Sequence, residues 1–307
     1  TVLEGGMAID DPTFSAHMDR CLGCRACETA CPSGVPYGHL LEAARATINP
    51  ARPLPLIARV VLHVFARPSL LRPTMAVARL LRASKISRAL AHLPGRAGFA
   101  FAMLDSTRPL QSVQHYAPPM APTRGRVALL DGCVMRELYA ETNRATARVL
   151  GVNGYEIAPA PGQGCCGALH AHAGDLESAR MLARTNIAAF EASGAEFVGM
   201  NSAGCGAMCK EYGHLLADDP QWAERATAVA ARVRDVNELL VAAGPVAAAA
   251  VPMRVAYDAP CHLLHAQRIA EAPLRVLAAV GGVELVPLID ADQCCGGAGK
   301  GMPGKPL

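Results

Sequence analysis

The 307-residue chain carries a formal net charge of +3, and 51% of its residues are hydrophobic. Such a small charge does not indicate a nucleic-acid partner. The hydrophobic fraction is enough for a large core, and the length is enough for about two domains. No apolar run is long and uncharged enough for a membrane span, because residues 54–66 include Arg59 and His63 and residues 239–251 include Gly244 and Pro245.

Residues 1–50 are expected to fold around the run Cys21-Leu-Gly-Cys24-Arg-Ala-Cys27-Glu-Thr-Ala-Cys31-Pro32. This C-x₂-C-x₂-C-x₃-C-P spacing is that of bacterial ferredoxins, which bind [4Fe–4S] clusters. Cys21, Cys24 and Cys27 are therefore predicted to hold one cluster. Cys31 either ligates a neighbouring cluster, as in two-cluster ferredoxins, or completes the single one. Helices are expected to start near Asp11-Pro12 and to run from Tyr37 to about Ile48.

Residues 51–104 alternate apolar residues with arginines and contain several prolines. The apolar positions recur at helical spacing, which predicts two or three amphipathic helices. Two interpretations stay open. The helices form a layer packed on the rest of the protein with Arg in solvent, or they present a basic face to a membrane surface or a partner subunit. The Pro- and Ser-rich stretch 105–125 is predicted to be a linker.

Beyond residue 125 the pattern predicts alternating strands and helices. Strands are expected at 126–130, 155–158 and 196–200, helices at about 138–150 and 175–193, and only helices from 207 to 243. The order then restarts, with strands at 254–257 and 283–287 around a helix at about 264–280. We interpret this as an internal repeat of two Rossmann-like α/β cysteine-rich units, 126–244 and an incomplete 253–307. The expected fold is thus mixed α-β, with an all-helical ferredoxin-like segment and helical layer first.

Cysteines follow the predicted strands at matching places in both units. There are 31 residues between Cys133 and its Cys-Cys-Gly triplet, and 32 residues between Cys261 and the second triplet. Parallel strand ends meet at one sheet edge, so four thiols should gather in the first unit: Cys133, Cys165, Cys166 and Cys205. The second unit offers Cys261, Cys294 and Cys295. Thiolate sets of this kind suit iron–sulfur clusters or zinc.

These cysteines, and the histidines near them, have possible roles other than metal binding. A disulfide framework is typical of short secreted chains, and this long chain with adjacent cysteines favours ligation in a reducing cytoplasm. A single buried thiol can act as a small hydrophobe, and Cys209 is as well explained that way as by ligation. Four histidines near the cysteines are expected to be structural: His170, His172, His262 and His265. No dinucleotide-binding G-x-G-x-x-G follows a predicted strand.

With these motifs placed, the chain resembles the iron–sulfur subunit of glycolate oxidase (glycolate dehydrogenase). The resemblance rests on residues 21–38, 164–170, 202–206 with 210–213, and 261–267. It implies electron transfer beside flavin-containing glycolate oxidase subunits that oxidise glycolate to glyoxylate, with electrons passing toward a quinone. It also implies a cytoplasmic location, with peripheral contact at the inner face of the membrane.

The family has two ferredoxin motifs and a complete second cysteine-rich repeat, which this sequence does not match in full. We therefore expect a longer native protein with a second [4Fe–4S] cluster. Related alternatives are subunits of anaerobic glycerol-3-phosphate dehydrogenase and heterodisulfide-reductase-like complexes. A zinc-binding scaffold without redox activity is a further alternative of a different class.

Overall fold

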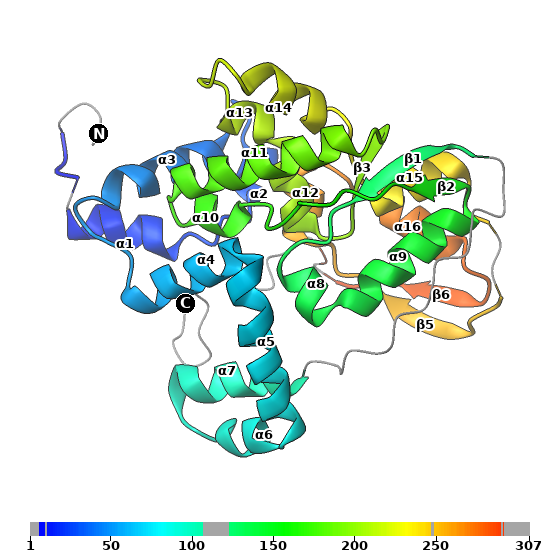
Figure 1. The fold of residues 1–307 in the computed structure, drawn as a ribbon, viewed down its shortest axis with the longest axis horizontal. Coiled ribbons are helices and arrows are strands. Elements are labelled where there is room, and N and C mark those ends of the chain that lie inside the picture. The colour runs from blue at the N-terminus through cyan, green and yellow to red at the C-terminus, as the bar shows by residue number, and fades with distance from the viewer. Residues whose placement is uncertain (1–5, 10, 107–122, 247–248, 290, 292–307) are drawn as a thin grey trace.

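A computed structural model describes residues 6–9, 11–106, 123–246, 249–289 and 291 (Figure 1). The N-terminal part consists of three helices, α1 (Pro12–Arg20), α2 (Ala26–Ala30) and α3 (Tyr37–Ile48). Asp11 caps α1 by accepting hydrogen bonds from the backbone N–H groups of Thr13 and Phe14, at 2.8 and 3.0 Å. Helix α3 has the predicted bounds, and α2 lies inside the cysteine run.

Four helices follow where two or three were expected: α4 (Leu56–Ala66), α5 (Pro68–Ala83), α6 (Ile86–Leu90) and α7 (Gly95–Ser106). Arg67 is extended before Pro68, which ends α4, and Lys85 is left-handed with φ 61°, which separates α5 from α6. Figure 1 shows α5 leading away from the α/β part to α6 and α7.

The first α/β unit contains a parallel four-stranded sheet in the order β2-β1-β3-β4. Its strands are β1 (Gly125–Leu129), β2 (Tyr155–Ile157), β3 (Phe197–Met200) and β4 (Val233–Asp235). Strand β4 corrects the prediction of helices alone over 207–243. Only three residues pair with β3, so the segment is too short to show a strand pattern in the sequence.

The helices of this unit follow the strands in alternation. They are α8 (Val134–Leu138), α9 (Ala140–Val152), α10 (Ala168–His172), α11 (Leu176–Ala192), α12 (Ala203–Lys210), α13 (Tyr212–Leu215), α14 (Ala223–Ala230) and α15 (Val236–Ala243). The helix predicted at about 138–150 corresponds to α9, and the short helix α8 precedes it, separated from it because the chain leaves helical geometry at Tyr139. Asp175 caps α11 as expected.

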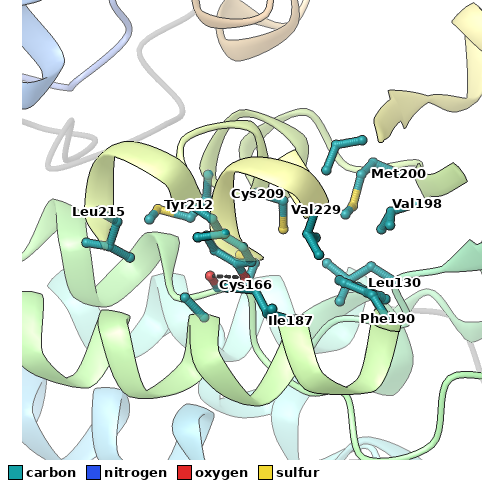
Figure 2. Packing of buried hydrophobic residues seen from close by; sticks show 14 of the residues in the cluster. Leu130, Cys166, Ile187, Phe190, Val198, Met200, Cys209, Tyr212, Leu215 and Val229 are labelled. Atoms are coloured by element: carbon teal, nitrogen blue, oxygen red, sulfur yellow. Dashed lines mark hydrogen bonds between the residues drawn. The ribbon is translucent and has the colours of Figure 1, made fainter. Parts of the chain in front are cut away.

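Neighbouring residues of β1 point to opposite faces of the sheet, as the strand period requires. Ala128 faces a core built on α11 and α14, whereas Val127 faces a core built on α9 and α15. Figure 2 shows the first of these cores, in which Phe190, Ile187 and Tyr212 are fully buried. The sheet is thereby covered on both faces, and the loops after its strands are the parts free to form a site.

The second α/β unit comprises β5 (Met253–Ala256), a π-helical turn η1 (His262–Ala266), α16 (Glu271–Ala278) and β6 (Val283–Val286). Strands β5 and β6 pair in parallel. The helix predicted at 264–280 is wrong as a single element, because Arg268 is left-handed (φ 57°) between η1 and α16. Among the helices that the structure describes, none has the length and apolar character needed to cross a bilayer.

Candidate functional site

The ferredoxin-type loop turns sharply enough to bring its first three cysteines together. Gly23 and Arg25 both have left-handed backbone, with φ of 67° and 63°, and this reverses the chain within the Cys21–Cys27 run. Burial and the Glu28 carboxylate raise the pKa of Cys27, and the thiols of Cys24 and Cys21 add to that rise. Thiolates this close repel one another, so a bound iron–sulfur cluster would relieve the repulsion. The donor set fits a [4Fe–4S] cluster.

Cys31 has a different environment from the other three. The backbone N–H groups of Val35, Ser33 and Gly34 surround its sulfur, and the first two lower its pKa most. N–H groups aimed at a sulfur stabilise its thiolate form, which is the form that binds metal. The position fits either role predicted for Cys31.

The second site is a row of four cysteine thiols from three strand-following loops. Side-chain hydrogen bonds join Cys133 to Cys165, Cys165 to Cys166, and Cys166 to Cys205. The first three residues are buried and Cys205 is partly exposed. The sequence predicted this gathering from the parallel topology.

The direction of the pKa shift alternates along this row of thiols. Hydrogen bonds from Cys133 and Cys166 lower the pKa of Cys165, and a hydrogen bond from Cys166 lowers the pKa of Cys205. The same bonds, with burial, raise the pKa of Cys133 and Cys166. Thiols that share protons in this way suit a soft metal, which would displace those protons on binding. Within the described ranges, no three His, Cys, Asp or Glu side chains surround a common point that could hold a single metal ion.

A buried amide fixes the Cys-Cys-Gly loop. Asn186 on α11 accepts a hydrogen bond from Gly164 N–H at 2.9 Å and donates to the Cys165 carbonyl at 2.9 Å. It also donates to the Tyr212 hydroxyl at 3.0 Å. That hydroxyl donates in turn to the Cys166 carbonyl at 2.9 Å (Figure 2). Sequence reasoning missed Asn186. Its signal was a lone amide on the apolar face of a helix, where a buried polar group needs partners.

Two further side chains, those of His170 and Cys209, lie near the row, and the sequence did not settle their roles. His170 is buried, its Nε2 lies 3.2 Å from the Leu62 carbonyl of α4, and its ring lies close enough to Cys165 to help lower the pKa of that thiol. Cys209 is completely buried in the core, where burial raises its pKa and Tyr212 is its hydrogen-bond partner. The structure therefore places Cys209 as a packing thiol beside the row.

The ferredoxin-type loop is docked on both α/β units through polar contacts. His262 Nε2 donates to the Gly23 carbonyl at 2.9 Å, and Thr29 Oγ1 lies 2.9 Å from His265 Nδ1. Arg25 forms an ion pair with Glu211 of the first unit. Cys261 lies directly before η1, which contacts α2 and α12. Cys294 and Cys295 lie outside the described residues.

Glu211 collects further contacts on the α3 side. Its carboxylate lies 3.2 Å from His39 Nε2, and the His39 ring stacks on His214 with centroids 3.7 Å apart. His172, next to the Cys-Cys-Gly unit, pairs with Glu42 at 2.8 Å. His262 and His265 thus hold the cysteine loop against the second unit, and His172 holds α3 against the first, as structural histidines.

Comparison with known proteins places both sites in described families. A 4Fe-4S binding domain matches residues 16–37, and the cysteine-rich domain matches 127–210 and again 255–305. A probable glycolate oxidase iron-sulfur subunit from Bacillus subtilis is 36% identical over 311 residues, which cover 96% of this chain and 70% of the relative. The chain belongs to the family of glycolate oxidase iron–sulfur subunits.

Two other relatives of this iron–sulfur subunit are a second glycolate oxidase subunit and a lactate utilization protein. The glycolate oxidase iron-sulfur subunit of Escherichia coli is 36% identical over 292 residues, covering 92% of this chain and 68% of the relative. Lactate utilization protein A of Geobacillus thermodenitrificans is 35% identical over 176 residues, 57% of this chain. A glycolate oxidase iron–sulfur subunit is an electron-transferring part of an oxidoreductase that has other subunits.

Proposed function

We propose that this chain carries electrons from a flavin-containing partner subunit, which oxidises glycolate, to a quinone. Oxidation of glycolate to glyoxylate releases two electrons and two protons, and a quinone takes up two of each to become a quinol. Iron–sulfur clusters, when bound, supply one-electron transfer between the two. The observation that carries the proposal is the docking of the Cys21–Cys31 loop against the unit that holds the row of four thiols.

In this proposal each group of cysteines has its own role. Cys21, Cys24 and Cys27 hold a [4Fe–4S] cluster, and Cys31 ligates a neighbouring cluster or completes the same one. The four thiols of the first repeat form a second iron–sulfur or zinc site. The second repeat contributes Cys261, Cys294 and Cys295 to a corresponding site.

The residues between the cysteine loop and the row of thiols set the distance between these two sites and the access of solvent to them. Arg25 and His39 bind Glu211 from the N-terminal side, and His262 holds the Gly23 carbonyl from the second unit. These contacts fix the loop relative to both repeats, and electron transfer needs a fixed, short separation between its centres. Asn186 and Tyr212 hold the carbonyls of Cys165 and Cys166, so the thiols of that loop are preorganised for ligation.

The test is purification of the complex with its flavoprotein, followed by dye reduction and electron paramagnetic resonance. Reduction of the dye by glycolate, with a reducible [4Fe–4S] signal from this chain, would support the proposal. A zinc scaffold would give no reducible iron–sulfur signal.

The similarity to lactate utilization protein A makes lactate, another 2-hydroxy acid, the second candidate substrate. Faster dye reduction with lactate would move the assignment to that acid. Activity with glycerol 3-phosphate or with a heterodisulfide, and with neither hydroxy acid, would support the corresponding alternative complexes.

A further inference from the structure

One ring nitrogen of His170 is buried beside the row of thiols without a hydrogen-bond partner. The residue is 1% exposed, and its Nε2 lies 3.2 Å from the Leu62 carbonyl oxygen of α4. A carbonyl oxygen only accepts hydrogen bonds, so Nε2 carries a proton and Nδ1 is the nitrogen left over. Among the described residues, Nδ1 has no hydrogen-bond partner. A buried polar atom left in this way costs stability unless another group fills the position.

The local backbone brings this ring to the Cys-Cys-Gly loop. Gly167 has left-handed backbone, with φ 92°, and α10 begins directly after it. The His170 N–H donates to the Gly167 carbonyl at 3.0 Å, so His170 lies in the first turn of the helix. Hydrogen bonds from Cys133 and Cys166 lower the pKa of Cys165 most, and the His170 ring lowers it further. Since the Leu62 carbonyl occupies Nε2, Nδ1 is the ring nitrogen available to the row.

The row of thiols is apolar and closed on this side. Cys133 and Cys165 belong to a buried cluster with Leu71 of α5 and Leu182 of α11. Further apolar side chains of α4 and α5 pack against this cluster: Val64, Phe65, Ala66 and Met75. An apolar shell of this kind keeps water from competing for a metal site. A histidine that ligates a metal through one nitrogen and donates its other N–H to a backbone carbonyl is the usual arrangement in metalloproteins.

We propose that His170 Nδ1 is an additional ligand of the metal centre at the row of thiols, bound to one iron of an iron–sulfur cluster. The proposal rests on the proposed function for the presence of that centre. No three ligating side chains of the described ranges surround a common point for a single ion, whereas a cluster takes its ligands on separate irons. A row of thiols with a nitrogen at its side therefore fits a cluster better than one zinc ion.

A nitrogen ligand would also set the direction of electron flow between the two cysteine sites. Neutral imidazole in place of a thiolate makes an iron–sulfur centre less negative and raises its reduction potential. The ferredoxin-type loop is expected to hold its cluster through thiolates, those of Cys21, Cys24 and Cys27. The row should therefore have the higher potential. It would accept one electron at a time from the loop cluster, which is oxidised as the row is reduced.

The first test uses the unaltered full chain. The protein is labelled with ¹⁵N at its histidines only, reduced, and measured by pulsed electron paramagnetic resonance, which detects nuclei coupled to the iron centre. We expect a coupled nitrogen that changes from ¹⁴N to ¹⁵N on labelling. A reducible row without histidine coupling would overturn the proposal and leave glycolate-dependent dye reduction, the test of the proposed function, untouched. A row that holds only zinc, or no metal, would overturn the proposal as well.

The substitution His170→Gln assigns the coupling to this residue. The glutamine amide can donate to the Leu62 carbonyl in place of Nε2, but it has no nitrogen in the place of Nδ1. The coupling should be lost while circular dichroism stays unchanged. The matched control is His172→Gln on the same helix, whose ring pairs with Glu42 at 2.8 Å and which should keep the coupling. Coupling that survives in His170→Gln, or disappears in both variants alike, would overturn the proposal, and the labelling result stands without either variant.

Discussion

The two cysteine sites of this chain are built in opposite ways. The Cys21–Cys31 loop takes its thiols from eleven consecutive residues, and its shape comes from local backbone, above all the left-handed Gly23 and Arg25. The row from Cys133 to Cys205 collects its thiols from three loops of a sheet and holds them in a buried environment. From this difference we expect that the loop can lose its metal without loss of the fold, whereas the row depends on the whole first unit.

The sharpest way to break this comparison is to remove one thiol from the loop. Cys24→Ser should abolish the [4Fe–4S] signal in electron paramagnetic resonance, because three clustered thiolates become two. Circular dichroism should show an unchanged repeat fold. A spectrum identical to that of the unaltered protein would contradict the ligand assignment.

Beside the row of thiols, the corresponding substitution is Asn186→Ala, and we expect it to change the stability of the fold. Asn186→Ala should lower the free energy of unfolding by about 3 kcal/mol, because it leaves the buried Cys165 carbonyl and the partly buried Gly164 N–H without the Asn186 side chain as their partner. Urea unfolding of the purified chain measures this loss. The matched control is Asn237→Ala on α15, whose partly buried side chain donates one hydrogen bond to Asp235 at 2.7 Å and whose loss should cost less than half as much. Equal losses would mean that Asn186 does not support the loop.

The stability of the interface between the N-terminal helices and the first unit should depend on pH. The Glu211 carboxylate raises the pKa of His39 against the effect of burial, while burial, with His39 beside it, lowers the pKa of His214. The His39 contribution to docking is therefore complete below the unfolded pKa of about 6.5 and is lost as pH rises through the raised folded value. The depressed pKa of His214 acts in the opposite direction, costing stability as pH falls.

Hydrogen exchange of the α3 amides should report this dependence. On raising the pH above neutrality, His214→Gln should show a steeper loss of protection than the unaltered chain, after correction for intrinsic exchange. His39→Gln should show little loss or none. The same slope in both variants would place the titration elsewhere.

The smallest expected effect belongs to the exposed edge of the loop. Thr29→Ala removes one solvent-accessible contact to His265 and should cost about 0.5 kcal/mol of unfolding free energy. Cluster content should stay unchanged. A loss as large as that of Asn186→Ala would show that the loop, too, depends on its tertiary contacts, and the contrast between the two sites would fail.

Sequence alone determined the features that depend on neighbouring residues. The ferredoxin spacing, the α3 helix, the Asp11 and Asp175 caps and the positions of five strands were all predictable, because spacing and local hydrogen bonds decide them. The gathering of Cys133, Cys165, Cys166 and Cys205 was predictable as well, since parallel strands bring their following loops to one edge.

Only the tertiary structure decided which residues contact the two cysteine sites and which segments pair with one another. Strand β4 exists because β3 offers it an edge, Asn186 has its role because α11 passes under the Cys-Cys-Gly loop, and Glu211 meets Arg25 across 186 residues of sequence. The same holds for α4 and α5, whose pattern left two uses open. Packing alone determined which side covers the thiols and which side stays exposed, because both sides of these helices are apolar.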